Sequence, residues 1–442
     1  MPAPQNPVLV VPGITATCLR DDYDLDAERV WTAFRSRYDD VALHPDDTRY
    51  ERQLPARVVA DQVFDIPYDE MLKDLRHDLS PNRREPTPVY AFPYDWRQPL
   101  VDTEAQLAGF VEEVIERTSL MRHYHKAGYA DDPTVDLVGH SMGGLVIAGY
   151  LASHGRDGRV GKVATLGSPF RGSFEAVIKV TTGLSSIGGR SASREREVSR
   201  IIPALYHLMP KFRGALETDP GIPTSIFDPG AWQKGVTATI EEYFRDFGKD
   251  ARMRASERRA AAAALFKGML DGAKKHRSRL ERLDLARAGL TSRDWLCVVG
   301  VGDETRVKLK IERSGRDVRF DLSSVERRQE WNPKRYVPTD ATGDGTVPYE
   351  GARCSFVPRN ELVCVSSGDW GYWEIGDRLL DGPFGVGLHG MLPKMNVVQK
   401  LIVSHFTGRS HSGVWGRRAP DMPLSERWNP PIRGLREKKP KA

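Results

Sequence analysis

Short apolar runs that end near glycine or proline recur along the chain and are typical of buried strands. They lie at residues 8–11, 89–97, 134–138, 160–166, 295–301 and 362–365. Stretches whose apolar residues are spaced for one buried helical face predict helices at about 102–124, 145–152 and 397–406. Asp102 or Thr103 is the expected N-cap of the first helix, and Thr103 with Gln106 matches a capping box. Because strands alternate with helices, the predicted fold class is α/β, with a mostly parallel sheet covered on both faces.

Two regions depart from this alternation. Residues 14–67 carry mixed charge and scattered aromatic side chains without a clear period, so we expect an excursion over the surface. From residue 171 to about 289 the strand signal stops, and helical patterns occur at 193–202, 237–247 and 251–285. Pro203 is expected to end the first of these helices. The predicted organisation is a core of residues 1–170 and 290–410, a helical cap or insertion at 171–289, and an irregular basic tail at 411–442.

Length and composition fit one large domain that carries a cap or insertion. The chain has 442 residues, of which 40% are hydrophobic and 28% charged, and its mean hydropathy is −0.47. A membrane span requires about 18 consecutive apolar residues, and no apolar run approaches this length. The first residues lack a basic segment followed by a long apolar stretch, so no secretory signal is predicted. We therefore expect a cytoplasmic location, with export that needs no signal peptide as the alternative.

The charge balance is mildly basic, with a net charge of +5 and a pI near 8.9. Part of the excess lies in the tail, at Arg436, Lys438, Lys439 and Lys441, and such terminal runs are usually solvated, frayed ends. Mild basicity favours peripheral contact with anionic lipid surfaces. No segment resembles a nucleic-acid-binding module, so nucleic acid is not an expected partner.

The cysteines do not indicate a metal site or a disulfide framework. Cys18, Cys297, Cys354 and Cys364 show no Cys-x-x-Cys spacing, so core or lone thiols are expected. Cys354 and Cys364 could still meet as neighbours on strands. No His-Glu-x-x-His motif occurs, which disfavours a metal-dependent hydrolase, and neither a metal nor another cofactor is expected.

The candidate nucleophile is Ser141, in Gly139-His140-Ser141-Met142-Gly143. A Gly-x-Ser-x-Gly turn between a strand and a helix presents the serine at a strained position, and the flanking glycines let the two backbones approach. The N–H of the following residue, Met142, then points at a developing oxyanion. The alternative is a glycine-rich turn with an incidental serine. His140 is expected to point away from the reaction centre.

A serine hydroxyl needs a histidine base and an orienting carboxylate, in the chain order serine, acid, histidine. His389, His405 and His411 follow the plausible acids, and His389 is favoured because it lies in a loop before the final helix. Asp344 in Gly343-Asp344-Gly345 is the candidate acid, since flanking glycines allow a tight turn that aims the carboxylate inward. Its alternative is an aspartate that satisfies only local N–H groups. Asp136 precedes the serine and is on the wrong side of it.

A second oxyanion donor usually comes from the loop after an early strand. Pro12-Gly13-Ile14 fits this place, with the N–H of Ile14 as the donor, although a Pro-Gly turn is also common as plain chain reversal. Trp31, Phe34 and the apolar face of the cap are candidates for acyl-chain or membrane contact, with ordinary packing as the alternative.

These landmarks together resemble the lecithin:cholesterol acyltransferase-like family of α/β-hydrolases, which includes lysosomal phospholipase A2 and bacterial relatives. The matching pieces are Val11-Pro12-Gly13, Phe92-Pro93-Tyr94-Asp95-Trp96-Arg97, Gly139-His140-Ser141-Met142-Gly143-Gly144, Gly167-Ser168-Pro169-Phe170-Arg171-Gly172-Ser173, the segment 202–210, and Gly343-Asp344-Gly345-Thr346-Val347-Pro348. The resemblance implies Ser141 as nucleophile, Asp344 as orienting acid and His389 as base. It also implies oxyanion donors at Met142 and Ile14.

The same resemblance implies a lipid ester substrate, an acyl-enzyme, and transfer of the acyl group to water or an alcohol. The chain departs from the mammalian relatives in two respects. Only Cys18 lies in the N-terminal region where they carry a disulfide, and the helical stretch 237–285 has no counterpart. The alternatives are a carboxylesterase that acts on soluble esters or lactones, and an inactive hydrolase fold that serves as a binding or effector module.

Overall fold

The computed structural model describes residues 4–23, 27–32, 36–46, 57–184, 192–249, 252–322, 342–371, 374, 387–411 and 413–438. Its centre is a six-stranded sheet in which every neighbouring pair is parallel, in the order β14-β9-β7-β6-β1-β5. The strands are β1 (Val8–Val11), β5 (Val89–Ala91), β6 (Val135–His140), β7 (Val160–Leu166), β9 (Trp295–Gly300) and β14 (Val363–Val365). Every residue of β1, β6, β9 and β14 is buried, which explains why these strands show no alternation with polar residues.

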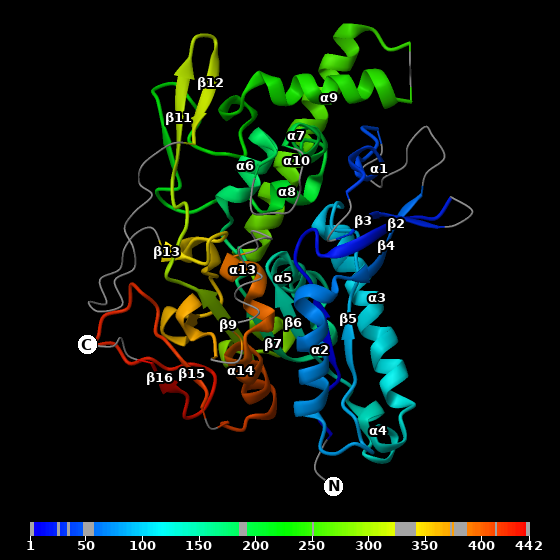
Figure 1. Cartoon of the computed structure of the whole chain (residues 1–442), viewed down its shortest axis with the longest axis vertical. Helices are drawn as coiled ribbons and strands as arrows, with labels where there is room; N and C mark the ends of the chain where they lie inside the picture. Colours follow the sequence, from blue (N-terminus) through cyan, green and yellow to red (C-terminus); the bar gives the residue numbers. More distant parts are fainter. Residues whose placement is uncertain are drawn as a thin grey trace.

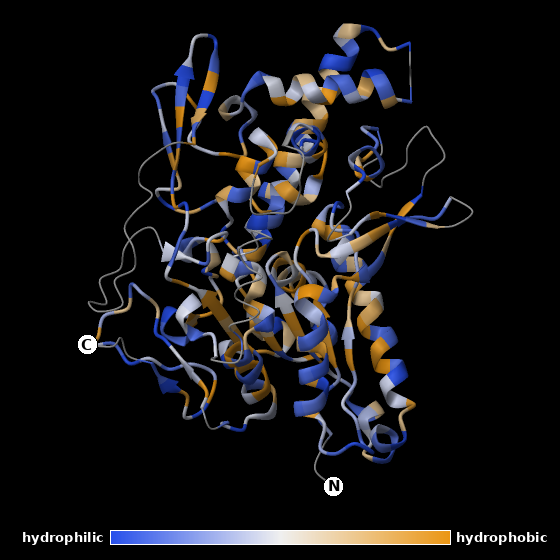
Figure 2. Cartoon of the chain, viewed as in Figure 1, coloured by the Kyte–Doolittle hydropathy of each residue, from blue (hydrophilic) through white to orange (hydrophobic). Residues whose placement is uncertain are grey.

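Helices cover both faces of this sheet (Figure 1). One face packs against α3 (Leu100–Ser119) and α5 (Met142–His154). The other packs against α2 (Asp65–Leu79), α13 (Gly387–Met391) and α14 (Asn396–Thr407). Figure 2 shows orange hydrophobic residues along β9, whereas α2 and α3 carry both colours, as expected for helices with one solvated side. The predicted α/β class with helices on both faces of a mostly parallel sheet is confirmed.

Several predicted boundaries shift. The strand expected at 89–97 ends at Ala91, because the residues from Phe92 onward form a buried loop rather than a ladder. Helix α3 begins at Leu100 with Pro99 as its N-cap, so the N-cap expected at Asp102 or Thr103 is wrong. This helix ends at Ser119, and α4 (Arg122–Lys126) follows as a separate turn.

The surface excursion holds a small sheet of its own. Strands β2 (Thr17–Asp21), β3 (Glu28–Trp31) and β4 (Val58–Val63) form an antiparallel sheet in the order β3-β2-β4, beside α1 (Tyr38–Val41). Both strand pairs contain shifts in register, which breaks the simple alternation that sequence patterns detect. The described residues of the predicted excursion therefore contain strands that its sequence pattern did not reveal.

A buried ion pair ties this excursion to the core. Arg97 is fully buried and donates to both carboxylate oxygens of Asp95, at 2.8 and 2.7 Å. The same guanidinium donates to the carbonyl oxygens of Val41 and Val58, at 3.1 and 3.3 Å. The Tyr-Asp-Trp-Arg motif thus joins two distant segments of the excursion to the loop after β5.

The region expected to be a helical cap contains α6 (Phe174–Thr182), α7 (Ala192–Ser199), α8 (Pro203–His207), α9 (Lys234–Phe247) and α10 (Ala255–Leu280). Pro203 occupies the first turn of α8 instead of ending a helix, a position where a missing N–H costs no hydrogen bond. The region also contains a strand that the sequence did not predict, β8 (Leu216–Thr218), which pairs with the hairpin of β11 (Leu309–Ser314) and β12 (Asp317–Asp321). Where the cap begins and ends remains a prediction.

The remaining elements are short. They are β10 (Asp303–Glu304), β13 (Thr342–Gly343), α11 (Tyr349–Ala352), β15 (Trp415–Gly416) and β16 (Arg436–Glu437). Short 3₁₀ helices lie at Tyr129–Asp131, Gly155–Asp157, Pro229–Ala231, Leu285–Ala288, Ser292–Asp294, Arg359–Glu361, Ser367–Asp369 and Leu392–Lys394. Among the described residues, no helix combines the length and the apolar composition that a membrane crossing needs.

The cysteines all lie in the core. All four are buried and carry free thiols. Cys354 lies beside Cys297 of β9, and burial together with this neighbour raises the pKa of its thiol. Cys354 thus contacts Cys297, and it forms no disulfide with Cys364, the pairing that the sequence left open.

The described part of the C-terminal tail is packed on the core, in contrast to the frayed end expected from its composition. Strand β15 pairs with β16, and the backbone of Arg417 bonds to Cys364 of β14. The buried carboxylate of Asp369 binds the side chains of Arg417 and Lys438. Burial alone raises the pKa of Asp369, but the hydrogen bond and charge of Arg417 outweigh it and lower the pKa to about 2.

Replacing Asp369 with asparagine is expected to lower the free energy of unfolding at pH 7 by about 3 kcal/mol, because two cations lose a buried carboxylate. Since the folded pKa lies below the ordinary value, this stabilisation is present above pH 4 and is lost as the pH falls towards about 2. Urea unfolding measures the change. The control is Asp69→Asn, which removes an exposed pair with Lys73 and should cost about 0.5 kcal/mol or less. Equal effects of the two substitutions would contradict the role of Asp369.

Candidate active site

The Gly-x-Ser-x-Gly segment forms a sharp turn between β6 and α5. Ser141 has φ 52° and ψ −124°, a backbone conformation that residues other than glycine rarely adopt. Helix α5 begins at the next residue. A Cβ atom at Gly143 would lie 2.1 Å from the carbonyl oxygen of Val11, at the end of β1. A Cβ atom at Gly139 would lie 2.8 Å from Cα of Gly144. The two glycines are therefore required by the close approach of helix and strands that presents Ser141 at the carboxyl edge of the sheet.

The predicted acid makes both kinds of contact that the sequence left open. One oxygen of Asp344 accepts the N–H groups of Thr346 and Val347, at 3.1 and 2.7 Å, as in a local turn. The other oxygen lies 2.7 Å from Nδ1 of His389. Asp344 is buried, and its loop lies against the end of β9, where a Cβ atom on Gly300 would come within 2.4 Å of the Asp344 Cβ.

The structure brings His389, and neither of the other two candidate histidines, to the candidate nucleophile Ser141. Its Nε2 lies 2.9 Å from Oγ of Ser141. His389 lies in the short helix α13 rather than in a loop. His405 is buried in α14, where burial lowers its pKa to about 4 and its Nε2 lies 3.2 Å from the carbonyl oxygen of Asp294. His411 is exposed beyond the end of α14.

The His140 side chain bonds to Tyr68 and to the backbone of the candidate base His389 rather than to Ser141. Its Nε2 lies 2.9 Å from the carbonyl oxygen of His389, and its Nδ1 lies 2.6 Å from the hydroxyl of Tyr68. A carbonyl only accepts, so Nε2 carries the proton and Nδ1 accepts from Tyr68. Burial, together with the nearby His389, lowers the pKa of His140 to about 3, which keeps the ring neutral.

Tyr68 extends this connection to the other side of the site. Its hydroxyl oxygen accepts the N–H of Gly13 at 2.9 Å while its proton goes to His140. A buried chain of hydrogen bonds thus runs from the loop after β1, through Tyr68 and His140, to the backbone of His389. Tyr68 lies in α2, 72 residues from His140, and no motif in the sequence singled it out.

Aromatic side chains fix the loop that carries Ile14. The hydroxyl of Tyr94 donates to the carbonyl oxygen of Pro12 at 2.8 Å, and the indole of Trp31 donates to that of Thr15 at 2.9 Å. Thr15 has a positive φ of 63°, so this backbone is held in a rarely populated conformation. A Cβ atom on Gly13 would lie 3.0 Å from Cβ of Ser141, which places the loop directly against the nucleophile.

The two predicted oxyanion donors are the N–H groups of Ile14 and Met142. Within the described ranges, neither N–H donates to another protein group, so both remain available to a ligand. Trp31 is only 5% exposed and holds the loop from inside, which does not fit the membrane contact considered for it. Phe34, the other candidate for such contact, lies outside the described residues.

An apolar cavity of about 20 Å³ lies next to Ile14. Trp31, Trp96 and Leu205 form part of its wall, and the buried ion pair between Lys179 and Glu195 closes another part. A space of this size holds about one water molecule. In this conformation the cavity is too small for an acyl chain.

Residues 67–250 of the chain match the model of the lecithin:cholesterol acyltransferase family. The family resemblance is confirmed. The match supports a hydrolase or acyltransferase of the α/β-hydrolase type as the class of enzyme. It contains Ser141 and Met142, whereas Ile14, Asp344 and His389 lie outside the matched residues.

Three solved structures are similar to parts of this chain. A chain of the Tle4–Tli4 complex is 16% identical, with 78% of this chain and 84% of that chain covered, at a TM-score of 0.49. The lipase BlEst2 of Bacillus licheniformis is 13% identical, with 87% and 91% covered, at a TM-score of 0.35. A protein of Listeria innocua is 12% identical, with 49% and 70% covered, at a TM-score of 0.18. No curated protein matches the chain.

The Gly167–Ser173 motif, part of the lecithin:cholesterol acyltransferase resemblance, lies against the side chains of Asp344 and His389. Gly167 has a φ of +56°, and a Cβ atom there would lie 2.9 Å from Oδ2 of Asp344 and 3.1 Å from Nδ1 of His389. Only glycine leaves room for their hydrogen bond. Arg277 of α10, which lies beyond the matched residues 67–250, is fully buried and donates to the carbonyl oxygens of Pro169 and His207, at 3.1 and 2.7 Å. The unmatched helix thus holds the matched loop in place.

Among the described residues, no group of three or more histidine, cysteine or acidic side chains is placed to hold a metal ion.

Proposed function

We propose that this chain is a serine hydrolase that cleaves carboxylic esters of lipids through an acyl-enzyme. The observation that carries the proposal is the continuous set of contacts from Ser141 Oγ to His389 Nε2 at 2.9 Å, and from His389 Nδ1 to Asp344 at 2.7 Å. A serine, a histidine and a carboxylate in this order provide a nucleophile, a general base and the group that orients the base.

In the first step, His389 accepts the proton of Ser141 as Oγ attacks the ester carbonyl carbon. Asp344 keeps the proton of His389 on Nδ1, so that Nε2 is free to accept. The N–H groups of Met142 and Ile14 bind the oxyanion, and each contributes about 3 kcal/mol to the transition state. The intermediate collapses to the acyl-enzyme, and the alcohol leaves with the proton from His389. Water or another alcohol then releases the acyl group by the reverse sequence.

The family match, which covers the proposed nucleophile, supports a lipid as the substrate. The cavity beside the proposed oxyanion donor Ile14 has the apolar lining that an acyl chain needs, but its volume is that of about one water molecule. Mass spectrometry of lipids after incubation with wild type and Ser141→Ala tests this proposal. We expect a free fatty acid or an acylated acceptor that is absent with the variant. A lipid pool unchanged by the wild type would contradict it.

The small volume of that cavity favours one second candidate, a carboxylesterase that acts on short soluble esters. The two functions differ in their preference for dispersed and aggregated substrates. Rates on liposomes and on short nitrophenyl esters separate them. Activity confined to the soluble esters would contradict a lipid as the substrate and favour the carboxylesterase. The proposed roles of Ser141, Asp344 and His389 would not change.

Tyr68 is proposed as a positioning residue for this reaction. Tyr68→Phe removes the hydroxyl that accepts from Gly13 and donates to His140, so we expect kcat to fall about tenfold with little change in KM, since about 1.4 kcal/mol of alignment is lost. The control is Tyr124→Phe, which removes a buried hydroxyl that donates to the carbonyl oxygen of Gln5. Both variants should lose about 1 kcal/mol of stability, but only Tyr68→Phe should alter kcat. Equal kcat values for the two variants would mean that Tyr68 is merely structural.

A further inference from the structure

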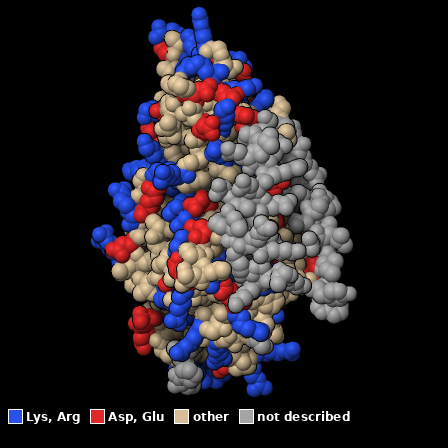
Figure 3. Space-filling model, turned by 90° about the vertical axis from the view of Figure 1, so that its left-hand side faces the viewer, with Lys and Arg blue, Asp and Glu red and all other residues tan. Residues whose placement is uncertain are grey.

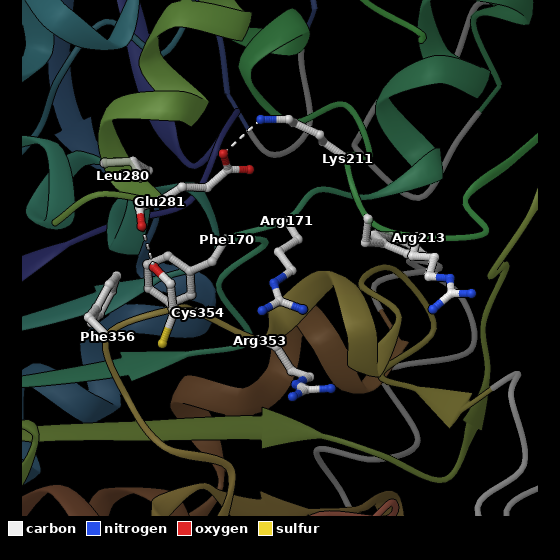
Figure 4. A pocket seen from close by; sticks show the side chains of 11 residues that line it. Phe170, Arg171, Lys211, Arg213, Leu280, Glu281, Arg353, Cys354 and Phe356 are labelled. Carbon is white, nitrogen blue, oxygen red and sulfur yellow. Dashed lines mark hydrogen bonds and ion pairs between the residues drawn. The ribbon is translucent and has the colours of Figure 1, made fainter. Parts of the chain in front are cut away.

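A second cavity, of about 240 Å³, lies outside the set of Ser141, Asp344 and His389. It is formed by the C-terminal end of α10, the loop before β8 and the segment that follows α11. Four of its lining residues are cations from three segments of the chain, and Figure 4 shows them around one open space. These are Arg171, Lys211, Arg213 and Arg353.

The carboxylates near the cavity do not balance these cations. Lys211 pairs with Glu281 at 2.7 Å. Arg171 and Arg353 share Glu350, at 3.5 and 2.9 Å. Arg353 also approaches Asp421 at 3.4 Å, but Asp421 is shared with Arg359 and Tyr349.

Two cations in this region have no carboxylate partner among the described residues. Arg213 is exposed at the rim and forms no ion pair there. Arg277 is buried next to this region without lining the cavity, and its hydrogen bonds go to backbone carbonyl oxygens, that of Phe170 included. The charge of Glu281 acts on it, but the two form no ion pair. Carbonyl oxygens satisfy the N–H groups of a guanidinium but do not neutralise its charge. The cavity therefore carries an excess of positive charge.

This excess is a local feature. On the face seen in Figure 3, basic and acidic side chains are interspersed, so the net charge of +5 does not form a one-signed surface there. The lining also has an apolar side, made by Phe170, Phe212 and Phe356, and the rings of Phe170 and Phe356 lie 5.4 Å apart. The space thus offers guanidinium groups beside aromatic rings.

The arrangement of the cations selects the chemistry of the ligand. A guanidinium presents paired N–H donors that match two oxygens of a phosphate, and several guanidinium groups from different directions suit a tetrahedral oxyanion better than a flat carboxylate. We propose that this cavity binds a phosphate group, carried either by a lipid headgroup or by a free phosphate. The proposal does not depend on ester hydrolysis, because none of the lining residues belongs to the reacting set.

Binding of inorganic phosphate to the full chain, followed by isothermal titration calorimetry, provides the first arm of the test. We expect a Kd on the order of 1 mM. The double variant Arg171→Gln/Arg213→Ala should weaken binding at least tenfold, because two charge-assisted contacts are lost. The matched control is Arg117→Gln/Arg245→Ala, which removes two exposed arginines elsewhere and should leave the Kd unchanged.

The second arm uses sedimentation with phosphatidylcholine vesicles that contain phosphatidate, with Ser141→Ala added to every protein so that no lipid is consumed. Weakening by the double variant in both arms supports a site that reads the phosphate itself. Weakening only with vesicles supports the lipid headgroup as its source, and weakening only with inorganic phosphate supports a free phosphate. The proposal is overturned if the double variant binds like wild type in both arms, or if the control loses as much affinity.

Discussion

Replacing Ser141 with alanine is expected to lower the rate of ester hydrolysis on the order of 10⁶-fold. The variant keeps the oxyanion donors and the His389–Asp344 pair but has no atom that can bond to the carbonyl carbon. Cβ of Ser141 lies close to Gly13, and alanine retains that atom, so the fold should be unaffected. The substitution therefore separates covalent catalysis from stability.

Two measurements check this result. A fluorophosphonate probe should label wild type at one site and should not label Ser141→Ala. Ser404→Ala is the matched control. Ser404 lies in α14, and its buried hydroxyl has no hydrogen-bond partner among the described residues. This control variant should retain labelling and rate. Equal labelling of wild type and Ser141→Ala would favour the inactive hydrolase fold as a binding module.

Asp344→Asn is expected to lower kcat by about 10⁴-fold. The asparagine oxygen can still accept the N–H groups of Thr346 and Val347, so the turn should persist. Its amide group would then face Nδ1 of His389, where the aspartate oxygen now accepts. The histidine would have to carry its proton on Nε2, and it could no longer take the proton of Ser141.

Rates measured beside thermal unfolding check this prediction. The control is Asp136→Asn, a buried aspartate of β6 that contacts Gln5, Asn6 and Lys162 rather than the reacting groups. It should change kcat less than about twofold even where it changes stability. An Asp344→Asn enzyme with nearly full kcat would show that the carboxylate serves only its local turn.

The elements best predicted from sequence are those whose pattern depends on burial alone. Strands β1 and β7 were predicted at their observed bounds, and β6 and β9 within two residues, because strands covered on both faces consist mostly of apolar residues. The turn at Ser141 was also predictable, since the required glycines lie within two residues of it. The small sheet of β2, β3 and β4 was not, because its bulges remove the alternation that would reveal it.

The residues of the candidate site also differ in whether a local sequence pattern could reveal them. The sequence supplied Ser141, Asp344 and His389 as candidates through local glycine patterns and chain order. It could not distinguish a turn-forming Asp344 from an orienting acid, since the structure gives one carboxylate oxygen to each role. It also did not identify Tyr68, because a single tyrosine on a helix face cannot be distinguished from an ordinary core residue until its partner His140 is known.

By itself, then, the sequence determined the α/β class, the strained serine turn and the family resemblance. These depend on hydrophobic periodicity and on glycine's conformational freedom, which act between residues close in the chain. Only the tertiary structure decided that His389 rather than His405 meets the serine, that Tyr68 and His140 join Gly13 to His389, and that a cluster of arginines surrounds one cavity. Those contacts join residues far apart in sequence, and their energies depend on distance and burial in space, which no local pattern encodes.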